Sequence, residues 1–418
     1  MATVDLRTRH QGDVIALDPS TFLDEHLPPL LEAHGPGAGA DAKRLGLVPL
    51  TLDVEGEQLT FAVADDDRLE VRRGAGDALV VAIDRTAFSD LMQDVSSTFG
   101  LQLADRIELR AGSFDDYLRW EPVLRALLDG RPAYEPGTID FVDLAGDPLD
   151  LQRSFTLDDA PEEIGHFLAE AGFVHLQGLF TEAEMAAVAA DHDHAIARAE
   201  QDDGASWWAR TEEQGWYAAR ILGFNHQSPA LREVLTSDRF AALAGFTDDD
   251  WVQRDPETTD AAEGLLKKVG VIEGASDVSW HKDCAPGGHS RGCCGMVVGI
   301  SVTGAGPENG ELGVVAGSHR ANIVQLGIDG LDLPRLPLPT RTGDVTIHCS
   351  CTLHMSRPPI SAERRVVYTG FGLAPRAGDH VVELDPAEVR RRRAAQNDHV
   401  RRTQREGRES SLVASFEL

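Results

Sequence analysis

Apolar and polar residues alternate along four short runs near the start of the chain, a pattern typical of half-buried β-strands. Turns rich in Gly, Asp and Glu separate these runs, which are residues 48–54, 59–63, 68–73 and 78–84. Apolar residues then recur at spacings of three and four, as on one side of a helix, at Phe88, Leu91, Met92, Val95 and Phe99. Residues 113–128 repeat a helical pattern behind a capping pair. These patterns predict a smaller α+β domain over residues 1–130.

The glycine-rich run 34–42 precedes these strands, and its residues 37–42 formally match G-x-G-x-x-A. The match follows Pro36 instead of a strand, so we expect a flexible segment and no dinucleotide site. Residues 131–153 carry prolines and glycines among polar residues and are predicted to be a linker.

The pattern changes again in the second half of the chain. A helical pattern ends at Gly172, a strand pattern covers 173–176, and a T-x-x-E capping box begins another helix at Thr181. From Val269 onward, short strands are separated by turns rich in Gly and Pro. This alternation predicts an antiparallel barrel or sandwich, and we assign residues 154–384 to it.

The charge of the chain excludes some partners. The 418 residues suffice for two or three domains, and 39 Lys plus Arg against 69 Asp plus Glu give a formal charge of −30. Such a charge repels phosphate backbones and anionic lipid, so we expect no nucleic acid partner. No stretch has the apolar length of a membrane span, and the start has no secretory pattern. We predict a cytoplasmic protein, with its oligomeric state left open.

The cysteines support a reducing compartment. There are five, all in the last third of the chain, too few for a disulfide scaffold, and we expect reduced thiols. The group of Cys284, His289, Cys293 and Cys294 lacks the C-x-x-C spacing of structural zinc sites, which disfavours zinc there. The remaining two are Cys349 and Cys351.

An arginine-rich segment, residues 385–418, follows the predicted barrel. It begins with a helix-start pattern at Asp385 and Pro386. We predict a basic helical tail whose charged face is solvated or pairs with acidic surface of the same chain. Binding of a phosphorylated ligand is the less favoured alternative.

The sequence SWHKD at residues 279–283 carries the most specific chemistry. In a strand, residues i and i+2 face the same side, so His281 and Asp283 project together while Lys282 points away. An H-x-D pair with one distant histidine makes the 2-His-1-carboxylate site of non-haem iron enzymes. The pair alone is a weak motif. The distant histidine can be His348 or His354.

Two neighbouring arginines, Arg364 and Arg365, begin a strand pattern that returns from these histidines. A guanidinium near the metal suits two-pronged binding of a carboxylate. Strand parity allows only one of the two to face inward, and it leaves open which one.

Three ordered segments, SWHKDCAPGG, NGELGVVAGSHR and GDVTIHCSCTLHMSRPPISAERRVVY, resemble the phytanoyl-CoA dioxygenase-like branch of the Fe(II)/2-oxoglutarate oxygenases. The resemblance covers about residues 154–384. It implies a mainly β fold, a double-stranded β-helix (jelly-roll, cupin-like) domain with flanking helices. Lys282 departs from the family, which often has Gln between the two ligands.

The resemblance also implies roles for single residues. His281 and Asp283 become the proximal metal ligands and His354 the distal ligand, so that His348 is a neighbour. Arg365 matches the position that binds the remote carboxylate of 2-oxoglutarate, and Ser356 a hydroxyl that helps it. Lys268 matches a position that is often basic. The cofactors implied are Fe(II), 2-oxoglutarate as co-substrate and O2.

The first domain has a resemblance of its own. The runs LTFAVADDDRLEVRRG, DALVVAID and RTAFSDLMQDVSSTFG are similar to sterol carrier protein type domains over about residues 40–130. This implies a lipid site between sheet and helices. A packing or dimerisation domain without a ligand is the alternative.

The resemblance of residues 154–384 implies an Fe(II)/2-oxoglutarate-dependent dioxygenase that hydroxylates or desaturates an unactivated C–H and releases succinate and CO2. The carrier-like first domain favours a small, apolar or lipid-like metabolite as its substrate. Halogenating relatives lack the carboxylate that this chain keeps as Asp283. A non-catalytic lipid carrier and a zinc-dependent hydrolase with the same ligands are the alternatives.

An aromatic cluster is expected either to line a substrate entrance or to pack in the core, and it comprises Trp207, Trp208, Trp216 and Tyr217.

Overall fold

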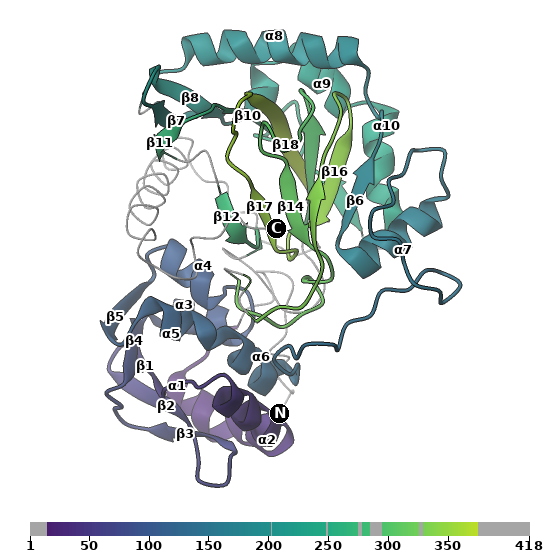
Figure 1. Ribbon diagram of the computed structural model, residues 1–418. Helices are drawn as coiled ribbons and strands as arrows, with labels where there is room; N and C mark the ends of the chain where they lie inside the picture. Colours follow the sequence, from purple (N-terminus) through teal and green to yellow (C-terminus); the bar gives the residue numbers. More distant parts are fainter. Residues whose placement is uncertain are drawn as a thin grey trace.

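Two units lie against each other in the protein, as Figure 1 shows. The structure is a computed structural model that describes residues 15–201, 203–247, 250–274, 278–284, 295–325, 328 and 330–374. The predicted basic tail, residues 385–418, lies outside the described residues, as do His289, Cys293 and Cys294. Within the described ranges, no helix is both long enough and apolar enough to cross a membrane.

A five-stranded sheet forms the centre of the N-terminal unit. Its order is β3-β2-β1-β4-β5, in which β1 and β4 are parallel and the other neighbours antiparallel. The four strands predicted between residues 48 and 84 are all present. Buried apolar side chains from the sheet and the helices form one continuous core. The strands are β1 (Leu50–Val54), β2 (Glu57–Val63), β3 (Leu69–Arg73), β4 (Leu79–Ile83) and β5 (Ile107–Ala111).

The glycine-rich run 34–42 is helical, which corrects the expectation of a flexible segment. It belongs to α2 (Leu27–Arg44), which follows α1 (Pro19–Thr21) and a π-helical turn, η2 (Phe22–His26). The small residues let the helix approach the chain between β2 and β3 closely, since a Cβ on Gly39 would lie 2.3 Å from the Asp67 carbonyl oxygen. Tertiary packing therefore outweighs the low helix propensity of glycine here.

The apolar stripe from Phe88 to Phe99 forms two helices instead of one. The chain breaks at Asp94, whose φ is 61°, and its buried carboxylate lies 3.3 Å from the Arg125 guanidinium. The Ser97 hydroxyl then accepts the amide of Gly100 and begins the next helix. The helices are α3 (Arg85–Met92), α4 (Thr98–Leu103), α5 (Phe114–Arg119) and α6 (Glu121–Asp129).

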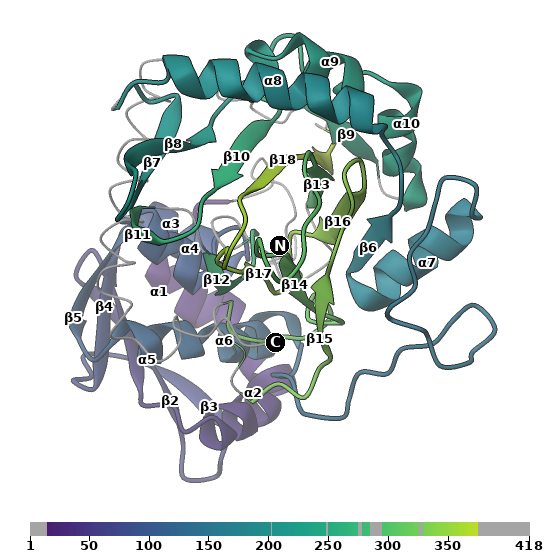
Figure 2. The same cartoon turned by 45° about the horizontal axis from the view of Figure 1, so that its top comes forward.

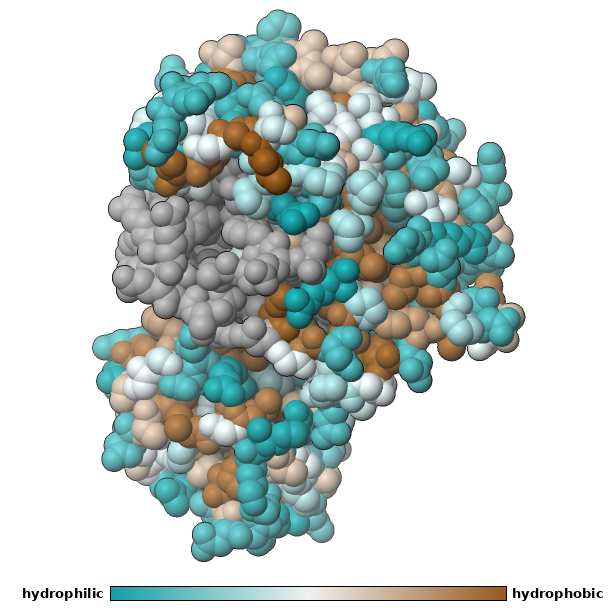
Figure 3. All heavy atoms as spheres, in the orientation of Figure 1, coloured by the Kyte–Doolittle hydropathy of each residue, from teal (hydrophilic) through white to brown (hydrophobic). Residues whose placement is uncertain are grey.

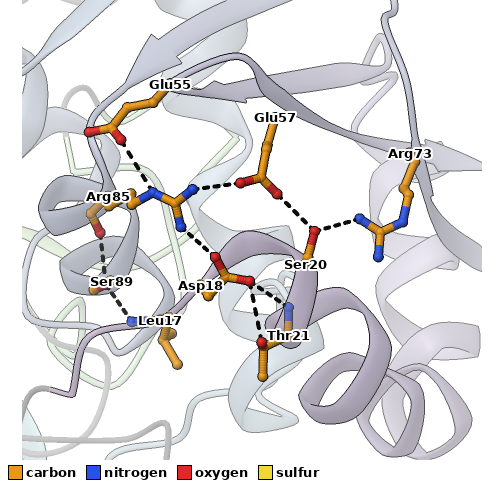
Figure 4. A network of polar contacts seen from close by, with 9 residues as sticks. All are labelled: Leu17, Asp18, Ser20, Thr21, Glu55, Glu57, Arg73, Arg85 and Ser89. Atoms are coloured by element: carbon orange, nitrogen blue, oxygen red, sulfur yellow. Dashed lines mark hydrogen bonds and ion pairs between the residues drawn. The ribbon is translucent and has the colours of Figure 1, made fainter.

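Surface ion pairs attach the start of this unit to its sheet, as Figure 4 shows. Arg85 contacts the carboxylates of Asp18, Glu55 and Glu57. The Arg85 side chain is 42% exposed. Exposed pairs contribute about 0–1 kcal/mol each, so the network orients α1 more than it stabilises the fold.

The second unit contains two antiparallel sheets. The nine-stranded sheet has the order β11-β7-β8-β10-β18-β13-β16-β6, with β9 also paired to β18, and the four-stranded sheet has the order β12-β17-β14-β15. The strands of the larger sheet are β6 (Phe173–Leu176), β7 (Ser206–Thr211), β8 (Gly215–Ile221), β9 (Trp251–Gln253), β10 (Glu263–Lys267), β11 (Val271–Gly274), β13 (Gly295–Ser301), β16 (Val345–Cys349) and β18 (Arg364–Leu373). Those of the smaller sheet are β12 (Val278–His281), β14 (Leu312–Val315), β15 (Arg335–Leu338) and β17 (His354–Ser356).

Helices pack along the outside of the nine-stranded sheet, and Figure 2 shows α8 running across it. Their apolar sides join the largest hydrophobic core, which also contains side chains from both sheets. The predicted capping box at Thr181 is present at the start of α8. The helices are α7 (Pro161–Ala171), α8 (Glu182–Arg198), α9 (Pro229–Leu235) and α10 (Asp238–Ala241), with 3-10 turns η3 (Phe224–His226) and η4 (Ala242–Phe246).

A loop after β14 joins the two units. The side-chain amide of Asn322 donates to the carbonyl oxygens of Pro122 at 2.8 Å and Arg131 at 2.9 Å. A cavity of about 550 Å³ lies at this junction, with Arg131 on one side and Lys282 on the other. Figure 3 shows apolar residues gathered near the same junction, among an otherwise mixed visible surface.

Candidate metal centre

His281 and His354 are brought together by strand pairing. His281 ends β12 and His354 begins β17, and the two residues are direct partners across this antiparallel pair. Their ring centroids are 4.2 Å apart. Asp283 follows just beyond the end of β12, with Oδ1 3.3 Å from Nε2 of His281 and Oδ2 3.5 Å from Nε2 of His354. One ligand atom from each residue lies within 4.8 Å of the others.

Main-chain carbonyls fix the tautomer of both histidines. Nδ1 of His281 lies 2.7 Å from the Ser279 carbonyl oxygen, and Nδ1 of His354 lies 3.0 Å from that of Thr352. A carbonyl oxygen only accepts, so each Nδ1 carries the proton and each Nε2 keeps its lone pair toward the centre. Two neutral imidazoles and one carboxylate in this arrangement fit a divalent transition metal such as Fe(II).

The electrostatics of the centre favour the protonation states that bind a metal. Partial burial of the Asp283 side chain, which is 37% exposed, raises its pKa, but His354, His281 and His348, which all face the carboxylate, outweigh this effect and hold the pKa well below its usual value. Burial and the neighbouring His348 hold the pKa of His354 well below its usual value. Near neutral pH, Asp283 is therefore ionised and His354 neutral, as metal coordination requires.

A cluster of two buried cations lies next to the metal centre. Ser356 is two residues beyond His354 on β17, and its hydroxyl accepts from Lys267 Nζ at 2.8 Å and from Arg364 Nη2 at 3.0 Å. Lys267 and Arg364 are direct partners on β10 and β18, and their residues are 1% and 3% exposed. The buried Nε of Arg364 has no hydrogen-bond partner among the described residues. We refer to Lys267, Ser356 and Arg364 as the cation cluster.

Arg365 and Lys268 face away from this cluster. Arg365 forms an ion pair at 2.7 Å with Asp193 of α8, and Lys268 donates to the side chain of Gln214 at 2.6 Å. Successive side chains of a strand point to opposite faces, so a shift of one residue separates these two positions from Arg364 and Lys267. The structure thus places Arg364, and not the expected Arg365, beside Ser356.

Three other residues lie beside the ligands or within the cation cluster. Lys282 lies just beyond the end of β12 and donates to the Ser318 carbonyl oxygen at 3.0 Å, whereas Asp283 contacts the histidines. His348, expected to be a neighbour, lies with Nε2 3.5 Å from Oδ2 of Asp283. Lys267 is absent from the sequence prediction, although its position next to Lys268 could have indicated it.

The aromatic cluster lies on the β7–β8 hairpin, where it contacts arginine and lysine side chains. The Arg220 guanidinium lies 4.8 Å from the Trp207 ring centroid, and Lys268 Nζ lies 5.1 Å from that of Tyr217. Tyr217 is buried, whereas Trp216 is exposed.

Two of the cysteines, Cys284 and Cys351, are buried as well. The redox state of the cysteines stays a prediction.

Comparison with known proteins supports part of this picture. Residues 168–367 match the model of the family described as Phytanoyl-CoA dioxygenase (PhyH), and the three ligands and the cation cluster lie within that range. A search of curated proteins gave no match.

Similar solved structures include EvdMO1, with 27% identity over 50% of this chain and 49% of that protein, at a TM-score of 0.40. This chain therefore spans about half the length of EvdMO1. AviO1 from Streptomyces viridochromogenes Tue57 is 23% identical over 51% of this chain and 96% of that protein, at a TM-score of 0.40. The epimerase SnoN, solved with Fe3+, alpha ketoglutarate and nogalamycin RO, is 18% identical over 54% of this chain and 92% of that protein, at a TM-score of 0.40.

Proposed function

We propose that the second unit is an Fe(II)- and 2-oxoglutarate-dependent oxygenase of the phytanoyl-CoA dioxygenase family, with a jelly-roll built from its two antiparallel sheets. The observation that carries this proposal is the position of two buried cations beside a 2-His-1-carboxylate set, joined to it through β17. The match of residues 168–367 to the family supports it.

His281, Asp283 and His354 would hold the metal. When bound, iron and 2-oxoglutarate supply the oxidising chemistry, in which the co-substrate is converted to succinate and CO2 while a C–H bond of the substrate is oxidised. The chain contributes orientation, since the carbonyls of Ser279 and Thr352 hold both imidazoles with Nε2 inward. It also contributes charge, since the low pKa of Asp283 means that its carboxylate is already ionised near neutral pH.

The cation cluster would bind the remote carboxylate of 2-oxoglutarate. Two cations side by side create a positive potential that attracts a carboxylate. Lys267 Nζ already donates to the Ser356 hydroxyl and to the carbonyl oxygens of Ser356 and Arg357, so it would contribute charge to the bound carboxylate. The buried Nε of Arg364, which has no partner among the described residues, would donate a charge-assisted hydrogen bond to it. This assigns to Arg364 and Lys267 the roles that the sequence resemblance gave to Arg365 and Lys268.

We further propose hydroxylation or desaturation as the reaction, because the chain keeps the carboxylate Asp283 that halogenating relatives lack. The proposed substrate is a small apolar metabolite, which the carrier-like first domain favours. The N-terminal unit, residues 1–130, is proposed as an accessory domain of the sterol carrier type, joined by the linker 131–153. Screening metabolite extracts for compounds that stimulate turnover of 2-oxoglutarate would identify the substrate class.

The test is 2-oxoglutarate-dependent succinate formation by the full chain, purified without oxygen and loaded with Fe(II). We expect slow succinate formation in air without substrate, loss of it with a chelator, and loss of it in Asp283→Ala. Asp193→Asn, which alters a carboxylate outside the metal centre, is the control and should retain it. Wild-type protein that forms no succinate, or that is active only with zinc in a hydrolytic assay, contradicts the proposal.

A further inference from the structure

A third histidine faces the metal centre from the opposite sheet. His348 lies on β16 of the nine-stranded sheet, whereas His281 and His354 lie on the four-stranded sheet. Its residue is 1% exposed, and its ring centroid is 4.2 Å from that of His354. Nε2 of His348 lies 3.5 Å from Oδ2 of Asp283. The fold thus brings three imidazoles around one carboxylate.

The ring nitrogens of His348 are not used by another hydrogen bond in the described part of the chain. Neither of its ring nitrogens has a hydrogen-bond partner of normal geometry among the described residues. Buried polar side chains are nearly always paired, and an unpaired one is usually connected to a ligand or a functional group. The carboxylate of Asp283 is the acceptor that its Nε2 faces.

Asp283 needs support of this kind. It lies beyond the end of β12, and its side chain is 37% exposed, more than that of either histidine ligand. Its polar contacts within the described residues are with His281, His348 and His354. If His281 and His354 direct their Nε2 lone pairs at a metal, they no longer donate to Asp283, and His348 is the remaining donor.

A direct bond from His348 to the metal conflicts with the proposed function, on which this inference rests. Three protein ligands leave three positions on a six-coordinate ion, and the proposed chemistry uses all three. A fourth protein ligand would leave only two. The arrangement therefore favours a hydrogen bond from His348 to the carboxylate.

We propose that His348 is a positioning residue, which donates its Nε2–H to Oδ2 of Asp283 and leaves Oδ1 to bind the metal. The carboxylate is then held toward the centre before the metal arrives. Partners of this kind that support a metal ligand typically change metal affinity by about 10- to 100-fold when they are removed.

The test is the affinity of the full chain for Mn(II) without 2-oxoglutarate, measured from the EPR signal of free Mn(II). His348→Phe keeps a ring of similar size and removes the donor, so we expect about 10- to 100-fold weaker binding. His348→Gln places an amide N–H near the position of Nε2 and should recover much of the loss. His192→Phe replaces another buried histidine, which packs on Phe224 outside the centre, and should bind Mn(II) like wild type.

A second measurement needs no variant of His348. Pulsed EPR of the Cu(II)-loaded wild type counts coordinated imidazoles through their remote nitrogens, and we expect two. Three imidazoles, or unchanged Mn(II) affinity in a folded His348→Phe, would overturn the positioning role and leave the oxygenase proposal intact. Absence of Mn(II) binding by wild type would instead contradict the metal centre itself, and this inference with it.

Discussion

The adjacent residues Arg364 and Arg365 provide a matched pair for testing the co-substrate site. Both lie at the start of β18, yet Arg364 donates to Ser356 Oγ at 3.0 Å while Arg365 pairs with Asp193 of α8 at 2.7 Å. Replacing each with glutamine removes the same charge from neighbouring positions on opposite faces of one strand. The difference in KM for 2-oxoglutarate between the two variants therefore shows which of the two side chains faces the co-substrate site.

The size of the effect follows from the contacts. Arg364 is 3% exposed, and a hydrogen bond from a buried charged group contributes about 1.5–3 kcal/mol. At about 1.4 kcal/mol for each factor of ten, Arg364→Gln should raise KM for 2-oxoglutarate by about 10- to 150-fold. Arg365→Gln loses a partly exposed ion pair worth about 0–1 kcal/mol, and this loss affects stability more than binding.

The assay measures succinate formation by the Fe(II)-loaded enzyme over a range of 2-oxoglutarate concentrations. Thermal unfolding of both variants shows whether each is folded. We expect the KM of Arg365→Gln to stay within about twofold of wild type, because its guanidinium does not reach the cation cluster. A rise in KM for Arg365→Gln, with none for folded Arg364→Gln, would show that Arg365, and not Arg364, binds 2-oxoglutarate.

Two further predictions concern stability. Gly39→Ala should lower the free energy of unfolding by about 1–3 kcal/mol, because its Cβ would lie 2.3 Å from the Asp67 carbonyl oxygen. Gly37→Ala in the same helix is the control, since its Cβ would meet nothing within 4 Å. Measured by urea unfolding, this control should be neutral or stabilising. Burial, aided by the charge of Arg365, lowers the pKa of His192 from 6.5 to about 4. The folded state then binds fewer protons than the unfolded state. The stability that neutral His192 contributes is therefore fully present above pH 6.5 and is lost as the pH falls toward 4. Wild type should therefore lose up to about 3 kcal/mol more than His192→Phe between pH 7 and pH 4, measured by urea unfolding, and equal losses would contradict the assignment.

The three residues that the structure brings together as a candidate metal site are the three that the sequence analysis predicts. The H-x-D spacing indicates His281 and Asp283 but leaves the distant histidine open, and only the family resemblance selects His354 over His348. The cation cluster depended on which face each strand residue presents. A one-residue difference exchanges Arg364 for Arg365, and only the pairing of β10 with β18 fixes that choice.

The N-terminal unit shows the same limit for local structure. The strands of residues 48–84 follow from alternation alone, because each presents apolar residues to one core. Helix α2 could not be predicted, because the glycines that make the sequence look flexible are needed for contact with Asp67 and Leu69, residues distant along the chain. The break at Asp94 likewise depends on Arg125, some thirty residues later.

The central claim is that one site holds Fe(II) and 2-oxoglutarate together. Its most direct test is an anaerobic titration of the Fe(II)-loaded protein with 2-oxoglutarate, followed by visible absorption. We expect a weak charge-transfer band that saturates with 2-oxoglutarate in wild type, needs higher concentrations in Arg364→Gln, and is absent in Asp283→Ala. Wild-type protein that binds Fe(II) but gives no band at saturating 2-oxoglutarate would contradict it.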